Sequence, residues 1–176
     1  MRYMLIFMII GSFLQAESFT LSSDTLKGQI SKAQEFNGFG CNGQNISPEL
    51  HWVHAPKGTK SFAITVYDPD APTGSGWWHW LIVNIPQNVT QIAQNASAKH
   101  MLPKGALETM TDYGMSGFGG ACPPQGDKAH RYIFTVHALD VESLDVKPET
   151  NSAVVGFMIN KHTIQKASLM SYYQRD

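Results

Sequence analysis

The segment DPDAPTGSGWWHW, residues 68–80, links two stretches of the chain that both predict β-strands. Before it, residues 61–67 (SFAITVY) are β-branched and aromatic, as is typical of a strand. After it, residues 80–85 (WLIVNI) form a nearly continuous apolar run, which predicts a strand buried on both faces. The prolines of the segment predict a rigid turn, with Ala71-Pro72 as a candidate cis bond. Alternation along the second strand predicts that His79 faces away from its two tryptophan neighbours.

The rest of the chain adds further strands and few helices. Residues 132–139 (YIFTVHAL) predict a third strand, and residues 19–21 a short edge strand. Residues 152–161 carry apolar side chains at helical spacing and have a capping residue among positions 150–152. A second, weaker helix is predicted over residues 99–107, although it contains a proline and a glycine. We therefore expect a mainly β fold, a β-sandwich with one or two short helices.

Composition limits the classes of protein that the chain can belong to. Its 176 residues are 43% apolar and only 15% charged, with a formal net charge of −1. This length suits one domain, and the 9 Phe, 6 Tyr and 4 Trp argue against disorder. A near-neutral chain lacks the basic excess that nucleic-acid binding requires, so we expect no nucleic-acid partner.

The N-terminus has the pattern of a secretory signal peptide. Arg2 precedes an unbroken apolar run over residues 5–10, and small or polar residues follow. The run is shorter than the roughly 20 residues that span a bilayer, so no transmembrane anchor is expected after processing. Residues 1–16 are therefore predicted to be a signal peptide, with cleavage after Ala16 or Ser18, and residues 17–176 a single domain. The alternative is a structural N-terminal strand or anchor. Export places the domain in the periplasm of a bacterium or outside the cell.

The two cysteines, Cys41 and Cys122, stand 81 positions apart and have no metal-binding spacing. In an oxidising compartment we expect one disulfide between them, the alternative being two buried free thiols.

Common catalytic signatures are missing. The match to G-x-G-x-x-G at residues 38–43 has no preceding strand, and there is no P-loop, nucleophile elbow or H-E-x-x-H.

A second unusual segment, GFGGACPPQG at residues 117–126, is followed by His130-Arg131-Tyr132. Its glycines are predicted to bring backbone N–H groups close to a ligand. His130 and Tyr132 are two apart and share one strand face. If this segment converges with Asp68 and His79, the result is a small pocket that suits a compact anion such as phosphate. The alternative is that both histidines are satisfied core residues.

The two segments closely resemble the signatures of the phosphatidylethanolamine-binding protein family. Residues 68–72 with Trp78-His79 resemble the first signature. Residues 120–124 with 130–132 resemble the second. Residues 45–52 (NISPELHW) resemble the bacterial YbhB/YbcL branch in particular, and the similarity covers nearly all of residues 19–170.

The resemblance implies a β-sandwich of one large and one small sheet, with a pocket at one end that binds phosphate-like or phosphorylated head groups. At matching positions the implied ligand-binding residues are Asp68, His79, Gly120, Cys122, Pro123, His130 and Tyr132. A bond between Cys41 and Cys122 would then join two loops at the rim of the pocket. Homodimers are plausible in this branch, whereas the extra C-terminal helix of animal members has no match. Residues 151–176 are instead expected to form one helix and a final strand.

The function expected from these features is non-catalytic binding of a small anionic ligand without a cofactor, with modulation of a kinase, protease or other signalling partner. The competing hypothesis is a hydrolase that uses the same pocket. Two histidines and one aspartate could hold Zn²⁺, or a histidine could act as general base. No activated nucleophile is visible in the sequence.

Overall fold

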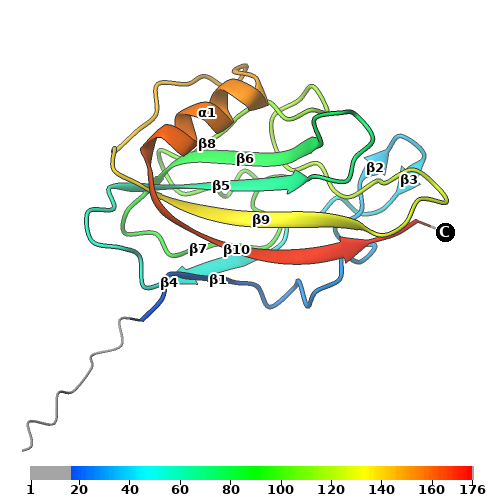
Figure 1. The fold of residues 1–176 in the computed structure, drawn as a ribbon, viewed down its shortest axis with the longest axis horizontal. Coiled ribbons are helices and arrows are strands. Elements are labelled where there is room, and N and C mark those ends of the chain that lie inside the picture. The colour runs from blue at the N-terminus through cyan, green and yellow to red at the C-terminus, as the bar shows by residue number, and fades with distance from the viewer. Residues whose placement is uncertain (1–16, 176) are drawn as a thin grey trace, which may run out of the picture.

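The computed structural model describes residues 17–175, so the predicted signal peptide at residues 1–16 lies outside the described residues. Within residues 17–175 the chain forms ten strands and one helix (Figure 1). In chain order these are β1 (Thr20–Ser22), β2 (Asn37–Gly38), β3 (Cys41–Asn42), β4 (Leu50–Val53), β5 (Ser61–Asp68), β6 (Trp77–Pro86), β7 (Gln91–Ile92), β8 (Leu107–Glu108), β9 (His130–Leu139), α1 (Ser152–His162) and β10 (Thr163–Tyr173).

Two antiparallel sheets form the predicted sandwich. The large sheet has the order β10-β9-β5-β6-β8, the small sheet has the order β1-β4-β7, and β2 and β3 form a separate hairpin. Alternate residues of β5 and β9 face the small sheet, and their apolar side chains form the main core with Trp52 and Trp80. The mainly β architecture with a large and a small sheet is therefore confirmed.

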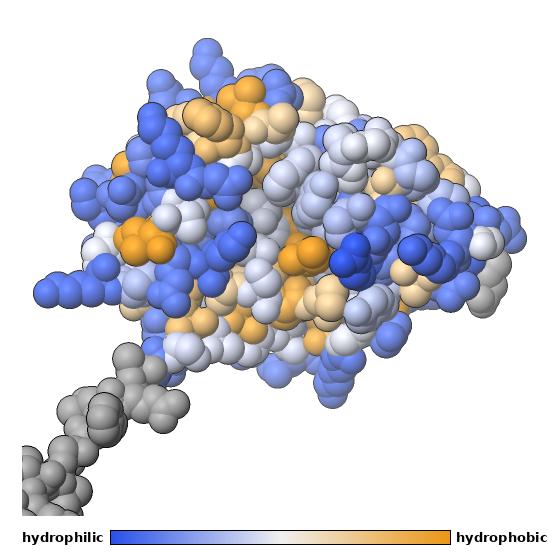
Figure 2. Space-filling model, viewed as in Figure 1, coloured by the Kyte–Doolittle hydropathy of each residue, from blue (hydrophilic) through white to orange (hydrophobic). Residues whose placement is uncertain are grey.

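Helix α1 covers part of the outer face of the large sheet. It begins where the Asn151 side chain accepts a hydrogen bond from the Val154 backbone N–H at 3.0 Å. Val155 and Ile159 are buried in a second apolar cluster with residues of β5, β6 and β9. Figure 2 shows this side of the molecule, with apolar groups over α1 at the top and further apolar groups at the left and centre among polar ones. The predicted helix at residues 152–161 and the strand after it are confirmed.

The helix predicted over residues 99–107 is wrong. His100 and Gly105 have φ values of 53° and 96°, which a right-handed helix does not allow. The segment forms turns, with a hydrogen bond from the Ala106 N–H to the Pro103 carbonyl, before β8 begins at Leu107. Among residues 17–175, no helix has the length and apolar character needed to cross a membrane.

A β-bulge in β6 reorients His79. The consecutive residues Val66 and Tyr67 pair with Trp80 and Trp78, so His79 is the extra residue on β6. Trp80 lies in the core between the sheets, whereas Trp78 packs on the side of α1. The prediction that His79 faces away from both tryptophans is therefore wrong, because simple alternation does not survive a bulge. The predicted cis bond is also absent: no peptide bond in residues 17–175 is cis.

Candidate functional site

A cavity of about 210 Å³ lies at the end of the large sheet where β5 ends and where β6 and β9 begin. It is the end of the molecule that also carries the β2–β3 hairpin (Figure 1). Of the seven residues predicted to bind a ligand, six line the cavity: Asp68, His79, Cys122, Pro123, His130 and Tyr132. Gly120 does not line it and lies behind His79, with its carbonyl 3.1 Å from Nδ1 of that residue.

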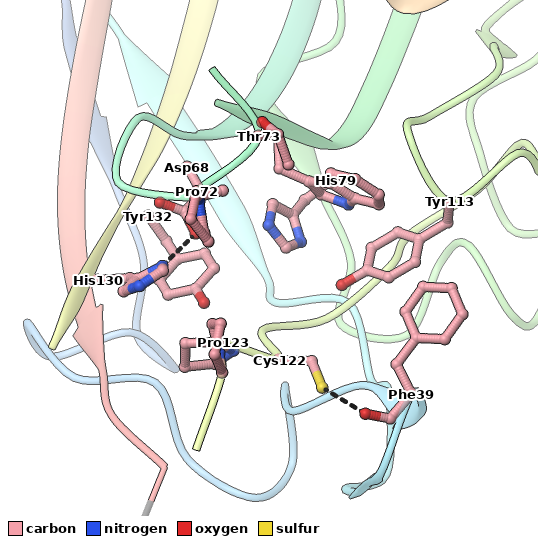
Figure 3. Close-up of a pocket in the computed structure, with 13 residues that line it drawn as sticks. Phe39, Asp68, Pro72, Thr73, His79, Tyr113, Cys122, Pro123, His130 and Tyr132 are labelled. Carbon is pink, nitrogen blue, oxygen red and sulfur yellow. Dashed lines mark hydrogen bonds and ion pairs between the residues drawn. The ribbon is translucent and has the colours of Figure 1, made fainter. Parts of the chain in front are cut away.

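Asp68 and His130 form a buried pair on one side of the cavity (Figure 3). His130 Nδ1 lies 2.8 Å from Asp68 Oδ2, and both side chains are almost completely buried. The other oxygen of Asp68 accepts the Asp70 backbone N–H at 2.8 Å, which fixes the carboxylate in the turn after β5. On its outer side, His130 Nε2 lies 3.4 Å from the half-exposed carboxylate of Asp127.

His79 lies opposite this pair and is held by the glycine-rich loop at residues 117–126. Its Nδ1 lies 2.8 Å from the Gly119 carbonyl oxygen and 3.1 Å from that of Gly120. Since both partners are acceptors, Nδ1 is the donor. Burial lowers the pKa of His79, although the two carbonyl groups and the nearby Asp68 charge oppose this change.

Three backbone amides of the loop at residues 117–126 are bonded within the protein, at Gly119, Gly120 and Ala121. The Gly119 N–H donates to the His79 carbonyl, the Gly120 N–H to Asn45 Oδ1 at 2.7 Å, and the Ala121 N–H to the Gln34 carbonyl. A Cβ atom on Gly120 would lie 2.1 Å from the Gln34 carbonyl oxygen. Glycine is needed there for close packing of two backbones, not for access to an anion.

Three aromatic residues form a wall of the pocket that the sequence analysis did not assign. The Tyr113 ring centroid lies 5.6 Å from that of Phe39, 5.4 Å from that of Trp77 and 5.5 Å from that of His79. The Tyr113 hydroxyl donates to the Gly120 carbonyl, and burial raises its pKa. Trp77 stands in the segment at residues 68–80, and Phe39 in the glycine-rich match at residues 38–43. Tyr113 belongs to no motif that could have found it.

Two buried donors in the pocket wall have no acceptor. The Tyr132 hydroxyl donates to no group among residues 17–175, and the Trp77 indole N–H has no hydrogen-bond partner there. Burial raises the pKa of Tyr132, so this hydroxyl keeps its proton. Unpaired buried donors are costly, and oxygen atoms of a ligand would satisfy them.

Two arginines lie near the cavity without lining it. Arg175 Nη1 lies 3.6 Å from the sulfur of Cys122, and Arg131, next to His130, pairs with Asp70. Arg131 forms two side-chain hydrogen bonds to Asp70, at 2.8 and 2.7 Å, and its backbone N–H donates to the same carboxylate. These contacts hold the pKa of Asp70 far below its usual range. No lysine or arginine is among the described residues that line the cavity.

The predicted disulfide is confirmed, with Cys41 bonded to Cys122. It joins β3 to the wall of the pocket and so anchors the hairpin whose tip carries Phe39. Phe39 itself is 71% exposed at the pocket rim. Figure 3 shows Phe39 and Cys122 on the same side of the cavity.

The described part of the chain does not gather three metal-binding groups in the pocket. Among residues 17–175, three candidate ligand atoms lie within 4.8 Å of one another only at Asp24, Glu49 and His51, which are outside it. Two of these three already bond to each other, since His51 Nδ1 lies 2.7 Å from Glu49 Oε1.

Comparisons with known proteins agree with the fold and with the two signature segments. The family described as phosphatidylethanolamine-binding protein matches residues 23–174. The Escherichia coli K12 protein YbcL is 49% identical over 164 residues, which is 91% of this chain and 90% of that protein. YbhB of the same organism is 48% identical over 87% of this chain and 98% of its own length. The crystal structure of E. coli YbcL superimposes with a TM-score of 0.88 over 90% of this chain and 99% of that chain.

Proposed function

Because this chain belongs to the phosphatidylethanolamine-binding protein family, we propose that it is a non-catalytic protein that binds phosphate or a phosphorylated head group in this pocket. The observation that carries the proposal is the set of polar groups around one cavity: the buried Asp68–His130 pair, His79, and the unpaired donors of Tyr132 and Trp77. A compact oxyanion offers acceptors to these donors within a volume of about 210 Å³.

Equilibrium titration of inorganic phosphate and of phosphoethanolamine tests this proposal. We expect His130→Ala to weaken binding about 10- to 100-fold, because hydrogen bonds to charged groups contribute roughly 1.5–3 kcal/mol. His162→Ala is the matched control, since His162 also pairs with an aspartate, Asp140 at 2.9 Å, but does not line the pocket. Equal affinities for wild type and His130→Ala would contradict the pocket assignment.

We also propose that the protein acts after export, in a bacterial periplasm or outside the cell, where it modulates a kinase, protease or other partner, with a homodimer as one form. A disulfide at the pocket rim supports an oxidising compartment, where such bonds persist. Fractionation of the native host, followed by light scattering of the recovered protein, tests location and assembly together.

The hydrolase hypothesis is supported by one feature, the carboxylate that orients His130 as it would a general base. However, the one threonine and the one cysteine among the described lining residues are not free nucleophiles, since the Thr73 hydroxyl donates to the Gly76 carbonyl and Cys122 is oxidised. Release of nitrophenolate from 4-nitrophenyl phosphate, with and without added Zn²⁺, tests this alternative. Turnover that His130→Ala abolishes would replace the binding proposal.

A further inference from the structure

The hydrogen bonds of His79 determine what it offers to a ligand. Nδ1 faces two carbonyl oxygens at 2.8 and 3.1 Å and must carry a proton. In the neutral ring Nε2 is therefore an acceptor with a free lone pair. A fully ionised oxyanion placed against that nitrogen meets repulsion instead of a hydrogen bond.

The surroundings of His79 keep the ring neutral. The side chain is 3% exposed, and burial lowers its pKa. The carboxylates of Asp68 on β5 and Asp112 in the loop after β8 raise the pKa, but burial has the larger effect and the pKa stays below its usual value. The aromatic rings of Tyr113 and Tyr132 pack nearly perpendicular to the His79 ring, with centroids 5.5 and 5.1 Å away.

The rest of the pocket does not favour a doubly charged ligand. No lysine or arginine is among the described lining residues, and the amides of Gly119, Gly120 and Ala121 are bonded within the protein. The carboxylate of Asp68 lines the cavity, and that of Asp127 lies 3.4 Å from His130 Nε2. Donors without an acceptor are present at Tyr132 and Trp77, whereas Nδ1 of His130 already faces Asp68. The pocket therefore needs a ligand with acceptor oxygens for these donors and one acidic O–H for His79.

We propose that the pocket binds a phosphomonoester in its singly charged form, with the P–OH of the ligand donating to Nε2 of His79, and that it discriminates against phosphodiesters. This inference rests on the proposed function and adds the protonation state and ester class of the ligand. A diester has no proton to donate, so its oxygen would face the His79 lone pair. The monoester can be a soluble metabolite or a lipid head group, since both present the same phosphate.

Methyl phosphate and dimethyl phosphate form a matched pair of probes for calorimetric titration between about pH 5.5 and pH 8. The second pKa of a phosphomonoester is about 6, so its monoanion becomes about tenfold rarer per pH unit above neutrality. We expect the affinity for methyl phosphate to fall by about this factor per pH unit. Near pH 7.5 each binding event should also take up about one proton, which is measured by comparing the binding enthalpy in buffers of different ionisation enthalpy. Dimethyl phosphate should bind at least about tenfold more weakly at pH 6 and take up no proton.

His79→Gln provides a second test, because its amide can donate as well as accept. We expect this variant to lose most of the preference for the monoester. The wild-type proton-uptake measurement needs no variant, so it decides the question even if His79→Gln does not fold.

The outcomes separate this inference from the proposed function. Equal, pH-independent binding of both esters, or proton uptake with the diester, would overturn the inference and leave phosphate binding intact. No binding of either ester or of inorganic phosphate at any pH would overturn both. Short-chain phosphatidic acid, which carries the same monoester on a lipid, distinguishes the source. If phosphatidic acid binds more tightly than methyl phosphate, the ligand is a lipid monoester. If the two bind equally, the ligand is a soluble monoester.

Discussion

At the scale of single residues, His137 is a buried base on the outer face of the large sheet. Its Nδ1 lies 3.3 Å from Thr163 Oγ1, whose own proton goes to the Ile159 carbonyl, so Nδ1 is the donor there. Thr65 Oγ1 then donates to Nε2 over 3.2 Å. Burial, with a smaller effect of the Lys166 charge, lowers the pKa of His137 to about 4.

This residue should make stability depend on pH. Below about pH 6.5 the unfolded chain protonates His137, whereas the folded protein does so only near pH 4, so folding loses free energy as pH falls through this window. The difference corresponds to roughly 3 kcal/mol at pH 4. We expect the unfolding free energy of wild type, from urea denaturation, to fall by about this amount relative to His137→Gln between pH 7 and pH 4. Parallel pH curves for the two proteins would show that His137 titrates normally.

The site residues that lie within the two signature segments could be predicted from the sequence. Asp68, His79, His130 and Tyr132 stand in the two signature segments and do converge on one cavity. The role of Gly120 could not be read from the sequence, because a glycine that frees a backbone for a ligand looks the same as one that lets two backbones pack. Only the contacts of Gly120 with Gln34 and Asn45 distinguish these roles.

At the scale of elements, the turn between β5 and β6 holds Asp68 in place through a close approach at Gly76. Gly76 has a φ of +69°, and a Cβ there would lie 2.2 Å from the Tyr67 hydroxyl and 2.7 Å from the Asp68 carbonyl oxygen. Gly74, two residues earlier, has a similar φ of +80° with no atom within 4 Å of such a Cβ.

The two glycines therefore form a matched pair of substitutions. Both alanine variants should lose about 1 kcal/mol through the left-handed backbone. Gly76→Ala should lose at least about 2 kcal/mol more through the clash, and should also bind phosphate more weakly because Asp68 moves. Thermal unfolding of both variants measures the loss of stability, and phosphate titration measures the loss of affinity. If Gly76→Ala and Gly74→Ala behave alike, packing at Gly76 is not important.

The positions of the main strands follow from local sequence patterns, but irregularities such as bulges depend on the strands that pair with them. The strands at residues 61–67, 80–85 and 132–139 were predicted nearly in place because apolar and β-branched runs favour sheets. The bulge at His79 depends on pairing with β5, which no pattern within β6 reveals. The helix predicted over residues 99–107 failed because its proline and glycine outweigh its few helix formers.

At the scale of the whole molecule, the disulfide links parts of the fold that are 81 positions apart. Loss of the bond frees a long loop in the unfolded state, which typically costs about 2–4 kcal/mol of stability. We expect Cys41→Ser combined with Cys122→Ser to lower the unfolding free energy by this amount, and reduced wild type to match it. Phosphate affinity should also fall, because the hairpin with Phe39 loses its bond to the pocket wall.

Urea denaturation of oxidised wild type, reduced wild type and the double variant tests this expectation, with thiol titration to verify each state. An unchanged midpoint after complete reduction would show that the hairpin is held by its other contacts. One of these is the hydrogen bond from the Asn42 N–H to Glu35 Oε1 at 3.0 Å.

The segment at residues 68–80 and its partner at residues 117–132 were enough to predict the family and six of the residues that line the pocket. Such features can be read locally because strand propensity, turn chemistry and motif order are properties of neighbouring residues. Other features of the site depend on chain segments that are far apart in sequence. These are the direction in which His79 donates, the bonds of the loop amides to Asn45 and Gln34, and the aromatic wall around Tyr113. Hydrogen-bond direction is set by the partner that packing supplies, so only the tertiary structure decides that Nδ1 of His79 is the donor.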